Sequence, residues 1–277
     1  MRGRMQASLI SVAAIASSFF AWFGVATVAL VILRVGQSAA PVFGAAVIAA
    51  SVWAAMGHLG PLLSLLVAAA AAMVLRSSGS WSWVLLIVPA SLVFLVQLVA
   101  QWAPAVFELM SAQFAAQLDE LNSKLPSGNA PVATAMPSIE QLTSVFAITQ
   151  GASVLFCLML ARWWQSLLYN PGGWQQEFHR LRLQTWHALV LLLAFFALLN
   201  ISRYPLMALL MLLPFVVAGL SVVHAALARW VAPNQRLPLL VLTYVVIWVP
   251  PVMYVLVLVA LMDSAIDLRA KWSAPKD

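Results

Sequence analysis

Residues 81–103 read WSWVLLIVPASLVFLVQLVAQWA, an apolar stretch of 23 residues without a charged side chain. A transmembrane helix needs about 20 consecutive apolar residues, because each residue rises about 1.5 Å and the hydrocarbon core is about 30 Å thick. Strands of a membrane β-barrel would be about ten residues long with alternating polarity, which this stretch lacks. The stretch therefore predicts a membrane-spanning helix.

Seven further stretches along the chain have the same apolar character. They are 7–33, 39–56, 59–75, 142–164, 186–199, 204–230 and 237–262. Backbone polar groups within lipid must be satisfied inside their own segment, so unalternating runs of this length are helical. We therefore predict an all-α fold, a single transmembrane domain (1–277) that forms a polytopic helical bundle of about eight spans.

The composition supports a protein embedded in lipid and argues against other classes. Of 277 residues, 64% are hydrophobic and 8% are charged, with a mean hydropathy of +0.98. A soluble domain carries about 25% charged residues. The pI near 10.1 does not indicate a nucleic-acid-binding protein, because the 14 Lys and Arg residues are scattered singly. The single cysteine, Cys157, excludes an intramolecular disulfide and a zinc site built from several thiolates.

The charges of the two longest connections predict which side of the membrane each one faces. Segment 104–138 carries three carboxylates and one lysine, whereas segment 165–185 carries Arg180 and Arg182, with Arg162 just before it. Basic residues concentrate in cytoplasmic loops. We therefore predict that 104–138 is an external loop and that 165–185 is a cytoplasmic loop.

The first apolar run, 7–33, is difficult to reconcile with this topology if it crosses the membrane once. A cytoplasmic N-terminus requires an odd number of crossings before residue 104, but four runs precede it. Two passes within 7–33, with a break near 22–24, would also place Arg34 and Arg76 on the cytoplasmic side. The alternative is one long tilted span, since about 27 helical residues rise about 40 Å. We favour a broken first segment.

The external loop is predicted to contain an amphipathic helix. Hydrophobic residues between Phe107 and Leu125 recur every three or four positions, as on a helix that lies along a membrane surface. Ser138, followed three residues later by Gln141, has the pattern of a capping box that begins the next span.

The cytoplasmic loop is predicted to contain a turn and a short interfacial helix. In Asn170-Pro171-Gly172-Gly173, proline and glycine occupy the two central positions that a type II turn requires. Trp174, Phe178 and Leu181 then recur at helical spacing, with polar residues between them. This element is either a simple interfacial anchor or a surface presented to a partner.

The sequence contains no recognisable catalytic arrangement. All eight acidic residues lie in loops or at the ends of runs, which disfavours proton-coupled transport and intramembrane carboxylate proteolysis. The four histidines lack metal-ligand spacing, and no phosphate loop or nucleophile elbow is present. We therefore predict no enzymatic activity, no catalytic residues, no metal and no cofactor.

Polar residues inside the runs are few, and they supply the candidate ligand-binding residues. Amide groups within a bundle bond either a neighbouring helix or a ligand, and both interpretations remain open. His224 is the one histidine deep in an apolar run. The candidates are Gln97, Gln101, Gln150 and His224.

Small residues at spacing four indicate helix faces that allow close approach. They occur at Gly36, Ala40 and Gly44 and again at Ala46, Ala50 and Ala54, where internal packing and docking of another membrane subunit both remain open. The candidate partner-docking residues combine two small pairs of the first run with the cytoplasmic segment. They are Ala13, Ala14, Ser17, Ser18, Arg162, Trp163, Trp164, Asn170, Pro171, Gly172, Gly173, Trp174, Phe178, Arg180 and Arg182.

The stretch from Arg162 to Leu183, with its Trp-Trp pair and Asn-Pro-Gly-Gly turn, resembles the YybS-like family of bacterial membrane proteins. The Leu33-Arg34-x-Gly36 step is also similar. That family is distantly similar to the substrate-binding S components of energy-coupling-factor transporters. The resemblance implies a bacterial inner-membrane location and an uptake role, with docking on an ATPase-driven partner through small residues of the first helix. It implies no particular substrate.

Two functional hypotheses follow. The first is a non-enzymatic membrane protein that binds a small molecule within its bundle and acts in uptake with a membrane subunit or an ATPase module. The second is a scaffold or regulator that recruits cytoplasmic partners through 169–183. A cavity lined by polar groups would favour the first, and a solid core with an exposed cytoplasmic apolar patch would favour the second. A membrane enzyme ranks third.

Overall fold

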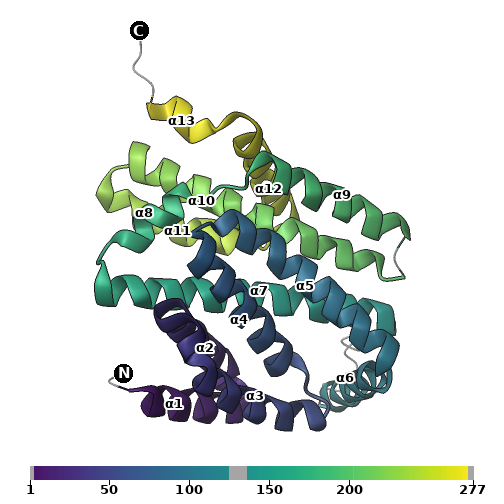
Figure 1. Cartoon of the computed structure of the whole chain (residues 1–277). Helices are drawn as coiled ribbons and strands as arrows, with labels where there is room; N and C mark the ends of the chain where they lie inside the picture. The colour runs from purple at the N-terminus through teal and green to yellow at the C-terminus, as the bar shows by residue number, and fades with distance from the viewer. Residues whose placement is uncertain (1–2, 125–135, 202, 274–277) are drawn as a thin grey trace.

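The computed structural model describes residues 3–124, 136–201 and 203–273, and every regular element within them is a helix (Figure 1). The all-α prediction is thus confirmed for this part of the chain. The α-helices are α1 (Arg4–Ala16), α2 (Ala21–Val35), α3 (Ala40–Ala55), α4 (Gly60–Ser78), α5 (Trp81–Trp102), α6 (Ala105–Ser123), α7 (Ile139–Tyr169), α8 (Gly173–Arg180), α9 (Thr185–Ile201), α10 (Leu213–Trp230), α11 (Pro233–Val246), α12 (Pro250–Ile266) and α13 (Leu268–Ser273). Short 3-10 segments are η1 (Ser18–Phe20), η2 (Gly36–Ala39) and η3 (Pro205–Leu212).

The core of the bundle lies around α7, which runs across the middle of Figure 1. This helix of 31 residues packs against α2, α4, α5 and η3. Ala147, Val154, Leu158 and Ala161 are fully buried on it, at intervals of three, four and seven residues. Large apolar side chains also remain exposed on the outside of the bundle, such as Phe94. A protein whose solvent is lipid leaves such side chains outside without cost.

Five helical segments are long and apolar enough to cross a membrane: Ala21–Ala55, Gly60–Ser78, Trp81–Trp102, Ile139–Tyr169 and Pro205–Trp230. Two bent pairs, α8 with α9 at 65° and α11 with α12 at 112°, raise this count to seven if each pair is one span. The described residues therefore provide five to seven candidate spans, where the sequence predicts about eight. The counts differ because an apolar run is not always one continuous helix.

The first apolar run is broken, but the break lies before the predicted position at 22–24. Ser17 adopts an extended conformation and ends α1, η1 follows, and α2 begins at Ala21. The two helices then pack against each other. Gly24 is a point of close contact rather than a break, because a Cβ there would overlap Ile15 and lie 2.9 Å from the Ser11 carbonyl.

This helical hairpin returns α2 to the end of the bundle where α4 ends. Arg76 Nη1 donates to the Leu33 carbonyl at 2.5 Å, and Arg76 shares a recess with Arg162 and Glu177. Arg34 lies over the ring of Tyr169 at the end of α7. Arg34, Arg76 and Arg162 therefore lie at one end, as the two-pass interpretation requires. We refer to it as the basic end.

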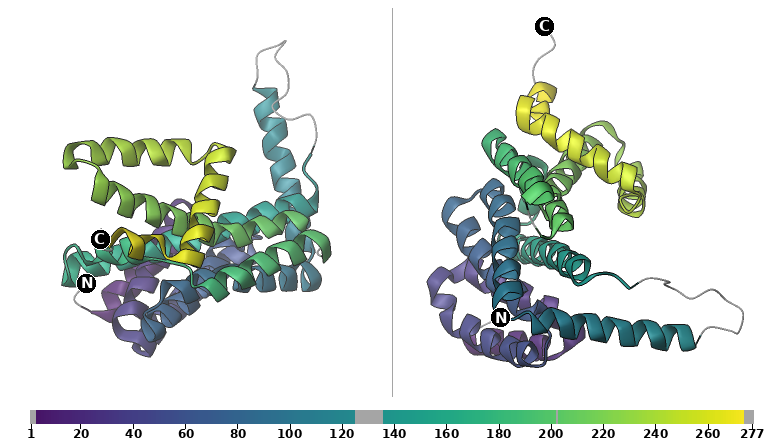
Figure 2. Two further views of the ribbon diagram at one scale, coloured as in Figure 1. Left: turned by 90° about the horizontal axis from the view of Figure 1, so that it is seen from above. Right: turned by 90° about the vertical axis from the view of Figure 1, so that its right-hand side faces the viewer.

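Helix α6 lies within the predicted external loop, at the opposite end of the bundle. Figure 2 shows it projecting from the body, crosswise to α7. Phe107 is its one buried residue, and it packs on Phe146 of α7. The predicted capping box is confirmed: Ser138 Oγ accepts from the Gln141 amide, and the Gln141 side chain accepts from the Ser138 amide. Residues 125–135 of this loop lie outside the described residues.

The last apolar run, 237–262, is also broken. Helix α11 ends at Val246, and Pro250 begins α12 at an angle of 112° to it. None of the residues of α11 is buried, whereas α12 buries Leu256 and Ala260 against α10. In the left view of Figure 2, α11 forms an outer edge of the molecule. The helix is thus packed on one side only.

Candidate functional site

The turn before α8 has the geometry that its sequence predicts. Gly172 has φ 83° and ψ −12°, and the Gly173 amide donates to the Asn170 carbonyl at 2.9 Å, as in a type II turn. The Trp174 amide also donates to Ser166 Oγ of α7 at 2.9 Å. These local bonds direct α8 back across the end of α7.

Glu177 anchors α8 to two other helices. Its carboxylate accepts from Arg162 Nε of α7 at 2.9 and 3.0 Å and from Trp81 Nε1 of α5 at 2.6 Å. Trp174 stacks at a tilt on Trp81, with ring centroids 5.6 Å apart. One face of α8 is thereby fixed to α5 and α7, and the other face is left to line a cavity.

A second group of ion pairs anchors the segment after α8 to the end of α12. Asp263, whose side chain is 2% exposed, accepts from Arg269 Nη2 at 2.6 Å and lies 4.0 Å from Arg182 Nε. Arg182 also pairs with Asp267 at 2.8 Å. Arg269 in turn donates to the carbonyls of His179 and Leu181. The position of α8 therefore depends on both groups of ion pairs.

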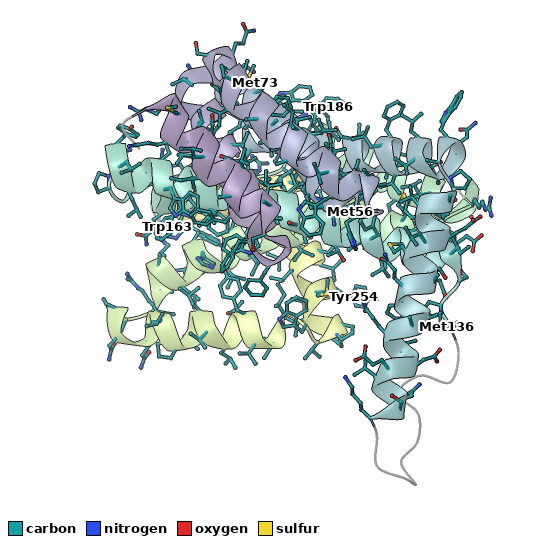
Figure 3. The ribbon with its side chains drawn as sticks, turned by 90° about the horizontal axis from the view of Figure 1, so that it is seen from below. Met56, Met73, Met136, Trp163, Trp186 and Tyr254 are labelled. Carbon is teal, nitrogen blue, oxygen red and sulfur yellow. The ribbon has the colours of Figure 1, made fainter. Side chains whose placement is uncertain are left out.

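The cavity lies between α7, α8, α10 and α11 and has a volume of about 440 Å³. Pockets of roughly 300–1,000 Å³ hold small ligands. Its walls are mostly aromatic and aliphatic, and Figure 3 shows Trp163 on the side of α7 that faces α10 and α11. The lining residues are Phe156, Met159, Leu160, Trp163, Trp174, Gln175, Phe178, His179, His224, Leu227, Ala228, Arg236, Leu240 and Tyr244.

A few polar groups converge within this apolar lining. His224 Nε2 of α10 and the Tyr244 hydroxyl of α11 are 3.0 Å apart, within hydrogen-bond distance. The Phe178 ring packs edge-on against His224 at 5.1 Å, and the His179 ring lies 6.5 Å from it. Arg236 Nε donates to the Val231 carbonyl at 2.8 Å. An apolar cavity with a few fixed polar groups is typical of a ligand-binding site.

The four predicted ligand-binding residues do not come together. His224 lines the cavity. Gln150 accepts from Ser64 of α4 at 2.5 Å and therefore joins two helices. Gln97 is half-buried and Gln101 is exposed, both on α5, which contributes no residue to the cavity.

The predicted partner-docking residues fall into two separate regions. Ala13, Ala14 and Ser17 lie at the end of α1 away from the basic end, and the Ser18 side chain lies outside the described part of the chain. All the others lie at the basic end. Trp163, Trp174 and Phe178 line the cavity, whereas Trp164 packs on Phe23 of α2. Arg162 and Arg182 form ion pairs within the chain. Arg180 and the turn residues Asn170, Pro171 and Gly172 are exposed, and Gly173 is half-buried.

The sequence does not single out His179, Arg236 or Tyr244. Their spacing along the chain gives no motif, because His179 lies on α8 whereas Arg236 and Tyr244 lie on α11, more than 50 residues further along the chain. The one usable signal is that Arg236 stands alone at the start of the last apolar run. Among the described residues, no group of three His, Cys, Asp or Glu side chains could hold a metal ion.

The apolar helices define a multi-pass α-helical membrane protein. Comparisons of the chain with protein-family models, with curated proteins and with solved structures found no match.

Proposed function

We propose that this membrane protein is the small-molecule-binding component of a transport system, and that the cavity between α7, α8, α10 and α11 is its binding site. The observation that carries the proposal is the convergence of His179, His224, Tyr244 and Arg236 on an otherwise apolar cavity. The resemblance of 162–183 to the YybS-like family, which is distantly similar to the S components of energy-coupling-factor transporters, supports a role in uptake with a partner subunit.

The alternative is a scaffold that recruits cytoplasmic partners through 169–183. Its exposed residues are Tyr169, Asn170, Pro171, Gly172, Gln175, Gln176 and Arg180. Arg162 and Glu177, however, are paired with each other, and Phe178 faces the cavity. Because these side chains contact other residues of the same chain rather than a partner surface, we favour the binding function.

Native mass spectrometry of the full chain, purified gently from membranes, tests the proposal. We expect a bound small molecule, or a co-purifying ATPase module. Leu240→Trp would fill the cavity from α11, whereas Leu242→Trp, two residues further along the same helix, would place the same side chain at a position that is 53% exposed. The bound molecule should disappear in the first variant and remain in the second. Its persistence in both variants, or a chain that carries neither ligand nor partner, would refute the proposal.

A further inference from the structure

We infer that the occupant of this cavity is an anionic amphiphile, with a carboxylate or phosphate head at Arg236 and a hydrocarbon body against α7. The inference rests on the proposed function and names the chemical class of the ligand.

The charge of the cavity favours an anion. Arg236 is permanently charged, and the fourteen lining residues include no Asp or Glu. None of the ion pairs among the described residues involves Arg236. Glu177, the carboxylate of α8, is bound by Arg162 and Trp81. Arg236, which is half-buried, therefore has no counter-ion within the cavity walls, and partial removal of an unpaired charge from water is unfavourable.

Arg236 is also held in a suitable geometry. Its Nε donates to the Val231 carbonyl at 2.8 Å, which fixes the plane of the guanidinium and leaves both Nη groups as donors. His179 of α8 and Gln175 line the same cavity and can donate to an acidic head. Paired N–H donors of a guanidinium match the two oxygens of a carboxylate or phosphate.

The rest of the cavity suits a hydrocarbon body. Phe156, Met159, Leu160 and Trp163 form its α7 wall, and Leu240 faces them from α11. The α11 wall is a helix without a buried residue, so the lipid beside the bundle is separated from the cavity by one loosely packed element. Arg236 lies in the first turns of α11, just after α10 ends with Arg229 and Trp230. Charged heads and interfacial tryptophans occur at this depth of a membrane protein.

Radiolabelled hexadecanoate, added to the full chain in nanodiscs, tests the inference, with hexadecanol as the uncharged probe of the same chain length. We expect saturable binding of the acid, and binding of the alcohol weaker by about tenfold or more, because a charge-assisted pair contributes about 1.5–3 kcal/mol. Arg236→Gln should lower the affinity for the acid by a similar factor without changing the affinity for the alcohol. Arg229→Gln is the matched control, since that exposed side chain donates to the Trp272 carbonyl outside the cavity.

The outcomes separate this inference from the proposed function. The acid and the alcohol could bind equally well, and Leu240→Trp could abolish the binding of both. That result would overturn the inference that the ligand is an anion, but it would still identify the cavity as a binding site. Binding that Leu240→Trp does not affect would overturn both. The thermal unfolding midpoint of each variant shows whether it is folded, and if Arg236→Gln does not fold, the comparison of acid with alcohol in the unaltered chain decides.

Competition identifies the source of the ligand. Displacement of hexadecanoate by dioleoyl phosphatidate in the nanodisc, and not by octanoate, supports an acidic bilayer lipid. Displacement by octanoate, and not by phosphatidate, supports a water-soluble organic acid. If neither compound displaced hexadecanoate, the inference that the cavity recognises an acidic head would be wrong.

Discussion

Asp263 shows how a carboxylate at the edge of an apolar run becomes part of the interior. Its side chain is 2% exposed and is paired with Arg269, whose side chain is 13% exposed. The second oxygen accepts from the Leu268 amide at 3.1 Å. Loss of one partner from such a pair leaves an uncompensated buried charge.

We expect Asp263→Asn to destabilise the protein by about 3 kcal/mol, because Arg269 would lose its counter-ion inside the fold. Glu120→Gln is the control, since Glu120 and Lys124 form a pair whose side chains are 66% and 69% exposed. Exposed pairs contribute about 0–1 kcal/mol. Thermal unfolding midpoints in one detergent would measure the difference, and equal shifts in the two variants would contradict this account of Asp263.

At the scale of the elements, the small residues divide into two groups. Ala46 and Ala50 of α3 are fully buried and serve internal packing. Gly44, on the other predicted face of that helix, would have no neighbour within 4 Å of an added Cβ. Gly219 of α10, outside the predicted small faces, allows a close approach of α12, because a Cβ there would overlap the Leu256 carbonyl.

Gly219→Ala should therefore force α10 and α12 apart and cost about 1–3 kcal/mol of stability. Gly44→Ala should leave stability unchanged or raise it by up to about 1 kcal/mol, because alanine favours a helix and meets no obstacle there. Unfolding midpoints of the two variants test this contrast. A similar loss in both would mean that the Gly44 face is covered by a second chain or subunit.

The whole molecule places its basic and acidic loops at opposite ends. Arg34, Arg76 and Arg162 lie at the basic end, whereas α6, with its carboxylates, projects at the other. Arg34 reaches the basic end because the chain folds back at Ser17 and α2 packs along α1.

Single cysteines at Arg34 and at Lys124 should therefore label from opposite sides of the membrane. The native thiol would first be removed by Cys157→Ala, since Cys157 is buried with its sulfur 3.2 Å from the Trp22 carbonyl. A membrane-impermeant maleimide added to intact cells should label position 124 and spare position 34. Labelling of position 34 from outside would contradict a first segment that crosses twice.

The features that the sequence alone predicts are local ones, which depend on residues close together in the chain. Uninterrupted apolar runs predict helices and a membrane location because the lipid requires every backbone bond to close locally. The Ser138–Gln141 capping box and the turn at Asn170–Gly173 were predictable for the same reason, since each involves a few consecutive residues.

The tertiary structure alone decides which distant residues meet. Gly24, within the expected break near 22–24, is a packing contact because Ile15 of the neighbouring helix lies against it. Among the cavity residues, the sequence predicts His224 as a ligand-binding residue and Trp163, Trp174 and Phe178 as partner-docking residues. The sequence cannot predict that Arg236, His179 and Tyr244 line the same cavity, because their proximity depends on how α11 folds back over α7 and α8. Helix packing brings together segments that are far apart in the chain, and local sequence patterns do not predict which segments will pack against each other.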